Sequence, residues 1–132
     1  MSEHKPKSLI LILAREFASN LATPIYIADA EGTLVYYNEP AEAIAGRPFS
    51  ETGEIPMREW SELLAPEALD GRPLEREEMP GGIAHYERHP AHGTLRVTGL
   101  DGKKRVIEST VFPLFGAEDE FHGTMAVFWE QK

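Results

Sequence analysis

Residues 25–38 read IYIADAEGTLVYYN, and this stretch decides the fold. Its two ends, 25–28 and 34–37, are β-prone, and the turn-forming residues 29–32 lie between them. Because Gly32 can adopt the positive φ that a tight turn needs, the pattern predicts an antiparallel β-hairpin. Both runs are apolar at nearly every position, so we expect both faces of the sheet to be covered at this hairpin.

The segment before the hairpin, residues 8–21, predicts an amphipathic helix. Apolar side chains recur there at spacings of three and four, at Ile10, Leu13, Phe17 and Leu21. The stripe is widened by Leu9, Leu11 and Ile12. Such width indicates either a helix with one face on its own domain and another on a partner chain, or a helix lying deep within its own domain. We expect residues 1–22 to form the dimerisation helix of a homodimer.

The stretch after the hairpin predicts a helical middle. Asn38 is a favourable N-cap for a helix that continues to Ala45. Pro40 fits the first turn of this helix, and Gly46 ends it. Residues 47–93 are rich in Pro, Gly and Glu, which predicts short helices and loops without a strand.

The negative charge of the chain is concentrated in this middle. The chain holds 22 acidic and 13 basic residues, a formal net charge of −9. Residues 39–87 hold twelve acids against four arginines, a net charge of −8. We expect these acids to form a solvated face that disfavours anionic ligands. The excess of acid also argues against binding to nucleic acid or to an anionic membrane, because both depend on basic side chains.

The last forty residues return to strand patterns. Runs at 94–98, 105–112 and 121–129 are β-prone, and an Asp-Gly pair at 101–102 predicts a tight turn between the first two. These runs predict a three-stranded antiparallel meander. A helix, two strands, a helical middle and three strands together predict an α+β fold with one five-stranded antiparallel sheet.

Length and the absence of cysteine exclude several classes of protein. A chain of 132 residues is the size of one domain. Without cysteine it has no disulfide, zinc–thiolate site, iron–sulfur cluster, cysteine nucleophile or thioether-linked cofactor. Its most apolar run, 9–14, is too short to span a bilayer, and no cleavage site follows it. We therefore expect a cytoplasmic protein without a membrane anchor.

Several short motifs occur in a definite order along the chain. In the first half they are ATPIYIADAEG at 22–32, VYYNEPA at 35–41 and Gly46. In the second half they are DGRPL at 70–74, EMP at 78–80, DGKKR at 101–105, PL at 113–114 and Gly123. Their order and spacing resemble the PAS family of sensory domains over about residues 21–130.

The resemblance implies a PAS-like sensor domain over residues 23–130. Its five-stranded sheet would carry short helices on one face and the N-terminal helix on the other. It also implies a small cavity between sheet and helices, which in this family holds haem, flavin, a metabolite or nothing. The family's sensors report occupancy of this cavity through dimer contacts.

Candidate cavity residues follow from the resemblance and from the period of two along a strand. The resemblance implies that Tyr37, the residue before Asn38, points into the cavity. Val35 then shares its face, and Tyr26 and Ala28 match them across the hairpin. The candidate lining is completed from the helical middle by Trp60 and His85. The face toward the N-terminal helix is expected to carry Ile25, Ile27, Leu34 and Tyr36. The two inward hydroxyls either meet a small molecule or bond to protein groups in a filled core.

Three histidines, His85, His89 and His92, are candidates for a metal or haem site. The spacing of the first two suits a metal pair on a helix, but Pro90 displaces His89 from helical geometry. We therefore expect loop histidines and no metal site. The resemblance implies that His85 lies on the helix before the third strand, where the family's haem sensors have their axial ligand. The glycine pair at 81–82 and the acidic surroundings argue against haem.

The sequence therefore predicts a cytoplasmic PAS-type sensor or protein-interaction module that is not an enzyme. We expect non-covalent binding of a small molecule and signalling through a homodimer or a separate signalling protein. The family's adduct-forming flavin and coumaroyl sensors need a cysteine, so a flavin here could bind only non-covalently. No kinase, cyclase or DNA-binding segment is recognised, so we expect the chain to act on a partner or to be part of a longer protein.

Two alternatives to this function stay open at this point. One is a haem-binding gas or redox sensor that uses His85. The other is a small cone-shaped α+β (NTF2-like) enzyme that uses Tyr37, Asp29 or His85 as acid or base. No phosphate-binding loop, nucleophile elbow or zinc-protease motif is present in the sequence to support an enzyme.

Overall fold

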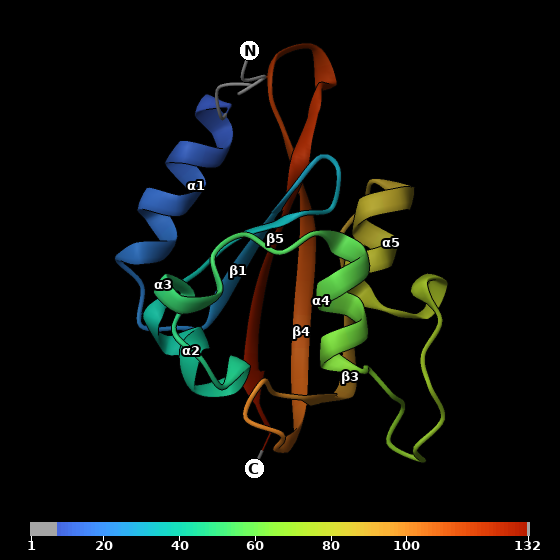
Figure 1. Cartoon of the computed structure of the whole chain (residues 1–132). Coiled ribbons are helices and arrows are strands. Elements are labelled where there is room, and N and C mark those ends of the chain that lie inside the picture. The colour runs from blue at the N-terminus through green and yellow to red at the C-terminus, as the bar shows by residue number, and fades with distance from the viewer. Residues whose placement is uncertain (1–7, 132) are drawn as a thin grey trace, which may run out of the picture.

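Five antiparallel strands form one sheet in the order β2-β1-β5-β4-β3 (Figure 1). The computed structural model describes residues 8–131. The strands are β1 (Ile25–Asp29), β2 (Leu34–Tyr37), β3 (Ala91–Thr98), β4 (Lys104–Phe115) and β5 (Phe121–Glu130). The helices are α1 (Leu9–Ser19), α2 (Glu39–Ala45), α3 (Phe49–Thr52), α4 (Met57–Leu64) and α5 (Pro80–Glu87), with 3-10 turns η1 (Arg76–Glu78) and η2 (Ala117–Asp119). The predicted α+β class and five-stranded antiparallel sheet are confirmed.

Helices cover both faces of the sheet at the hairpin of β1 and β2. Figure 1 shows α1 on one side of the sheet and α5 on the other. Ile25 and Ile27 of β1 are fully buried in the cluster beneath α1. Leu34 and Tyr37 of β2 belong to a second cluster, which includes Ile44 of α2. Every helix within residues 8–131 is too short or too polar to cross a membrane.

One side of α1 packs on the sheet. Its buried residues are Leu11, Ala14 and Ala18. Leu13 and Phe17, which also belong to the predicted broad stripe, lie on its other side and are 55% and 58% exposed. The small alanine side chains let the helix lie close to β1, so the bulkier leucine and phenylalanine face outward. The first seven residues of the predicted dimerisation helix lie outside the described residues.

A β-bulge in the hairpin reverses two of the predicted side-chain directions. Ile27 pairs with Tyr36, but the next pair joins Ala28 to Leu34, so Val35 is an extra residue in β2. Because a bulge shifts the alternation by one residue, the two side chains exchange faces. Val35 lies in the cluster beneath α1, and Leu34 lies in the cluster on the opposite face. The prediction that Val35 lines the cavity and Leu34 faces the N-terminal helix is therefore wrong.

The start of β3 and the end of β4 also differ from the prediction. β3 begins at Ala91 and pairs with β4 from there, so the expectation of no strand in 47–93 is wrong at its end. β4 continues past the expected end at Phe112 and runs through Pro113, which pairs with Thr124 of β5. The strand pattern did not extend this far because Gly93 of β3 and Pro113 of β4 are residues that disfavour strands. Pairing with the neighbouring strands keeps both residues in the sheet.

The side-chain amide of Asn38 joins three elements at the start of the fold. Its Nδ2 donates to the carbonyl oxygens of Ala18 and Thr23, both at 2.9 Å. Its Oδ1 accepts from the backbone N–H of Ile25 at 2.9 Å and of Ala41 at 3.3 Å. The residue is 1% exposed, so these four bonds replace all the water that the amide would otherwise bind. Asn38 therefore caps α2, as predicted, and also fixes the end of α1 against the start of β1.

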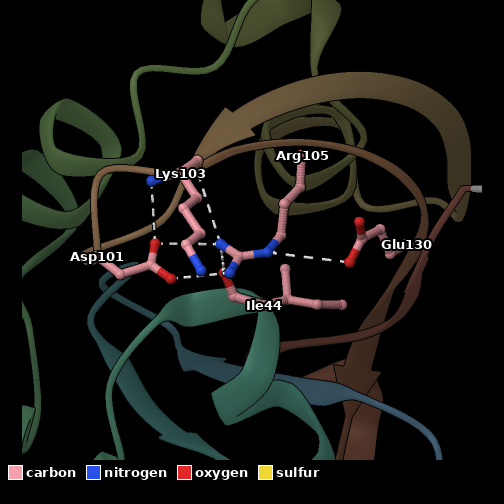
Figure 2. A network of polar contacts seen from close by, with 5 residues as sticks. All are labelled: Ile44, Asp101, Lys103, Arg105 and Glu130. Carbon is pink, nitrogen blue, oxygen red and sulfur yellow. Dashed lines mark hydrogen bonds and ion pairs between the residues drawn. The ribbon is translucent and has the colours of Figure 1, made fainter.

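Arg105 makes a second junction, between the end of α2 and the turn that joins β3 to β4 (Figure 2). Its guanidinium forms two bonds to the Asp101 carboxylate, at 2.8 and 3.2 Å, and donates to the Ile44 carbonyl at 3.1 Å. This cation lies near the C-terminal end of α2, where it interacts favourably with the helix dipole. Gly46, in the left-handed conformation, allows the approach, because a Cβ there would lie 2.6 Å from the Asp101 nitrogen.

Replacing Asn38 by alanine should lower the free energy of unfolding by roughly 3 kcal/mol, because four side-chain hydrogen bonds of a mostly buried junction are lost. Urea unfolding followed by circular dichroism measures this change. Asn20→Ala is the matched control, since the exposed Asn20 amide donates only to the Glu16 carbonyl. An Asn38→Ala variant no less stable than this control would contradict the role of the amide.

A second prediction concerns stability at low pH. The guanidinium of Arg105 holds the pKa of the Asp101 carboxyl well below its usual range. Its stabilising effect is therefore complete above about pH 4 and is lost as the pH falls further. Asp101→Asn should lower the urea midpoint at pH 7, and its difference from the wild type should shrink below pH 4. Asp70→Asn controls for the loss of one exposed turn carboxylate; an Asp101→Asn difference that stays constant with pH would refute the account.

Candidate functional site

A cavity of about 640 Å³ lies between the sheet and the helices opposite α1. Its walls come from β1, β3, β4 and β5 on one side and from α4, η1 and α5 on the other. Pockets of this volume are typical of small-molecule sites. The cavity therefore has the position that the sequence analysis expected between sheet and helices.

A smaller chamber of about 80 Å³ adjoins this cavity and is almost entirely apolar. Tyr26, Trp60 and Leu64 line both spaces. The rings of Tyr26 and Trp60 meet edge to face with centroids 5.4 Å apart. The Trp60 indole is held in place by a 3.0 Å bond from its N–H to the Gly32 carbonyl in the hairpin turn. These two rings therefore form a fixed aromatic wall where the two spaces meet.

The structure brings together most of the predicted lining residues. Tyr26, Ala28, Trp60 and His85 line the larger cavity. Tyr37 lines only the smaller chamber. Val35, displaced by the bulge, packs on the opposite face of the sheet. What any of these residues binds stays a prediction.

The two inward tyrosine hydroxyls differ in their partners. Tyr37 donates to the Arg47 carbonyl at 2.7 Å and lies 3.2 Å from the Thr52 hydroxyl. The Tyr26 hydroxyl opens onto the cavity and has no hydrogen-bond partner among residues 8–131. Burial raises the pKa of Tyr26 well above its usual range, so the phenol keeps its proton. Tyr37 thus belongs to the core, whereas Tyr26 offers a hydroxyl to the cavity.

Two further hydroxyls, which the sequence analysis missed, face the same space. Ser109 of β4 and Thr124 of β5 line the cavity and are 5% and 3% exposed. Neither side chain has a hydrogen-bond partner within the described part of the chain. The period of two along β4 and β5 could have indicated them, once the register with β1 was known. Because no fully buried side-chain oxygen among residues 8–131 lacks a partner, these three hydroxyls are reachable from the cavity, where a hydrogen-bonding guest can pair with them.

Close packing of α5 shapes the wall beside Tyr26. The glycine pair at 81–82 lies within this helix. A Cβ on Gly81 would lie 2.9 Å from the Tyr26 hydroxyl, and a Cβ on Gly82 would clash with the Arg76 carbonyl. The pair therefore lets α5 approach β1 and η1, at the cost of weaker helix propensity.

His85 lies in α5, before β3, as the sequence analysis expected. Its ring contacts Tyr86 and Phe121, with centroids 4.5 and 5.6 Å away. Burial, with help from the cationic Arg88, lowers its pKa, so the imidazole is neutral at physiological pH. No hydrogen bond occupies its ring nitrogens in the range 8–131. His85 therefore offers the cavity a neutral imidazole that can donate or accept.

The other two histidines lie apart from His85. His89 is exposed and interacts with Glu87 and the Pro90 carbonyl. His92 pairs with Glu108 on β4 at 3.2 Å. Over residues 8–131, no three side chains of His, Asp or Glu come close enough to hold a metal ion.

The charge at the cavity differs from the expectation for the helical middle. Arg58 of α4 and Arg76 of η1 line it, and no carboxylate among the described residues does. The acids of this segment point elsewhere; Glu67, for example, pairs with Arg96 at 3.1 Å, and Glu78 pairs with Arg72 at 2.9 Å. The prediction that this segment disfavours anionic ligands therefore does not hold for the cavity wall.

Two residues named for an enzymatic alternative have structural roles. The Asp29 carboxylate accepts from the backbone N–H groups of Glu31 and Thr33, both at 3.0 Å, and so closes the hairpin turn. The Tyr37 hydroxyl is bound by core groups. The described groups suit binding through hydrogen bonds and aromatic contacts.

A family sequence model described as the PAS fold matches residues 18–131. Comparison with curated proteins finds no match. Among solved structures, the PAS domain of BvgS from Bordetella pertussis is similar, with a TM-score of 0.62 and 20% identity, covering 92% of this chain and 85% of that one. The LOV protein of Rhodobacter sphaeroides gives a TM-score of 0.71 at 15% identity, covering 95% of this chain and 69% of that one.

A third similar structure is the PAS domain of nitrogen regulation protein NR(II) from Vibrio parahaemolyticus. Its TM-score is 0.62 at 16% identity, covering 90% of this chain and 98% of that one. Identities this low establish likeness of fold and carry no information about the ligand.

The two tyrosines provide a matched pair of substitutions. Tyr37→Phe should lower the free energy of unfolding by about 1 kcal/mol, because the Arg47 carbonyl loses its donor. Tyr26→Phe should change it by less than about 0.5 kcal/mol, because no protein partner is lost. Urea unfolding of both variants checks this. Equal destabilisation by the two changes would mean that the Tyr26 hydroxyl has a partner in the folded protein.

Proposed function

The chain belongs to the PAS fold family, as the sequence analysis predicted, and we propose that it is a sensor that binds a small molecule non-covalently in its cavity. The observation that carries the proposal is the wall formed by the hydroxyls of Tyr26, Ser109 and Thr124, which lack protein partners among residues 8–131. A guest that pairs with these groups would satisfy them in a space that Trp60 and α5 also line. The family match over 18–131 leaves no place for the cone-shaped enzyme fold.

The proposal includes a homodimer formed through α1. Leu9, Ile12, Leu13 and Phe17 present a continuous apolar surface on the side of α1 away from the sheet. Exposed apolar patches of this kind on a small domain mark interaction surfaces. A second copy is the simplest occupant, because a two-fold contact of identical α1 helices buries the same patch twice. A separate signalling partner and a cytoplasmic location stay predictions.

Strand β1 would transmit the effect of ligand binding from the cavity to the dimer contact at α1. Alternate side chains of this strand face the two sides of the sheet: Tyr26 lines the cavity, whereas Ile25 and Ile27 contact the cluster beneath α1. A ligand that shifts Tyr26 would therefore displace the surface on which α1 packs. Asn38 couples the same two elements, because it bonds to Ile25 of β1 and to Ala18 of α1.

A haem sensor is the second candidate, because His85 lines the cavity with a neutral, unbonded imidazole within the described residues. The residues fit the group: His85 would bind the iron, and Arg58 and Arg76 would neutralise the propionates. Haem would supply binding of a diatomic gas or a redox change. The absorption spectrum of the purified protein decides this: haem gives a Soret band that changes in His85→Ala, and a protein without that band is no haem sensor.

Ligand binding predicts a guest in the purified protein or a stabilising compound in a screen. Native mass spectrometry should detect a retained small molecule, or one compound should raise the melting temperature. A ligand at about 100 times its Kd stabilises by about 2.7 kcal/mol, a shift of several degrees. Ser109→Phe, which fills the cavity, should abolish either signal while the protein stays folded. No retained mass and no stabilising compound that depends on Ser109 would contradict the proposal.

The dimer is tested by Leu13→Glu, which places a charge in the outer apolar face of α1. Light scattering should give the mass of a dimer for the wild type and of a monomer for the variant, because a buried unpaired carboxylate is costly. Leu69→Glu, at a leucine of similar exposure outside α1, should leave the dimer intact. A wild type that is already monomeric would overturn this part of the proposal.

A further inference from the structure

The charged groups at the cavity are of one sign. Arg58 of α4 and Arg76 of η1 line it, together with the neutral His85, and no Asp or Glu among the described residues does. The surrounding segment 39–87 has a net charge of −8, so this cavity is a local exception. An arginine pair without a carboxylate on the same wall creates a site for an anion.

From this arrangement we infer that the ligand is a small aromatic anion, whose rings lie against Tyr26 and Trp60 and whose charge is bound by Arg58 and Arg76. This inference rests on the proposed function, because it names the chemical class of the molecule in the same cavity. A carboxylate or a sulfonate fits the planar fork of an arginine equally well.

The two arginines are available to such a ligand. Arg58 makes no ion pair or hydrogen bond within residues 8–131. Arg76 stacks over the Tyr86 ring at 4.4 Å and donates to its hydroxyl at 3.2 Å. Its contact with Glu77 is loose, at 3.9 Å, which leaves part of the guanidinium free. The stack holds the Arg76 side chain in place, so binding an anion costs it little side-chain entropy.

The aromatic part of the cavity wall favours a planar ring. Tyr26 contacts Trp60 edge to face at 5.4 Å and lies 5.9 Å from the Phe128 ring. Aromatic pairs at these distances add stabilisation beyond the burial of area, and a further ring extends the same arrangement. The hydroxyls of Ser109 and Thr124 then bond to polar atoms on the ring. An amphipathic aromatic molecule satisfies the apolar, hydroxyl and cationic parts of the wall together.

The test compares two fluorescent probes that share one ring system. 1-Anilinonaphthalene-8-sulfonate (ANS) carries an anionic group, and N-phenyl-1-naphthylamine (NPN) lacks it. We expect the protein to bind ANS more tightly than NPN, and added salt to weaken only ANS binding. Arg58→Gln and Arg76→Gln should each weaken ANS binding about fivefold and leave NPN binding unchanged. Arg15→Gln, which makes the same change in net charge on the α1 side of the sheet, should affect neither probe.

Two cavity-filling variants, Ser109→Phe and Thr124→Phe, locate the bound probe. Both should abolish ANS binding, which separates the cavity from the apolar surface of α1; circular dichroism checks that each variant is folded. If NPN binds as tightly as ANS, or if neither arginine substitution weakens ANS binding, the ligand is not an anion. Either result leaves the proposed function standing. If a probe still binds to both folded cavity-filling variants, or if neither probe binds to the wild type, the inference of an aromatic ligand in the cavity is wrong. The proposed function is contradicted only if native mass spectrometry finds no retained molecule and no compound raises the melting temperature.

Discussion

Four hydrogen bonds to one buried amide, that of Asn38, hold the fold together where its first three elements meet. They fix the end of α1, the start of β1 and the start of α2 relative to one another. A carboxylate at this position could not donate, and a hydroxyl could not reach all four partners, so the geometry needs an amide. With this junction in place, β1 has one face beneath α1 and the other open to the cavity. At the other end of α2, Arg105 bonds to Asp101 and to the Ile44 carbonyl and so fixes this helix to the β3–β4 turn.

The cavity is a consequence of how the helices opposite α1 are held. The hairpin turn positions Trp60 through the Gly32 carbonyl, and the glycine pair at 81–82 lets α5 lie close to Tyr26. Neither contact fills the space between α4, η1 and the sheet. Hydroxyls on β1, β4 and β5 stay without protein partners in residues 8–131, and two arginines line the same space. The same helices that cover the sheet therefore leave a polar and cationic site beneath them.

Local sequence signals predicted the elements well, because hairpins, caps and amphipathic helices depend on neighbouring residues. The turn before Leu34, the cap at Asn38 and the helix carrying His85 all lie where these signals indicated. Val35 was misplaced because one extra residue in a bulge reverses the alternation, and no local signal marks it. The sequence predicted two apolar faces for α1 but could not tell which one lies on the sheet, because a helix that is apolar on two sides does not reveal which side packs inward.

The site itself could be predicted only in part. Tyr26 was identified from strand alternation, but the sequence could not tell that its hydroxyl lacks a partner while that of Tyr37 has one. Ser109 and Arg76 were missed as cavity residues. The position of Ser109 depends on the pairing of strands distant in sequence, and that of Arg76 depends on the path of a loop. A crystal structure of the purified protein tests the central claim most directly. The account predicts a bound molecule within hydrogen-bonding distance of the Tyr26 hydroxyl; α4 and η1 collapsed onto the sheet, with that hydroxyl bonded to protein, would contradict it.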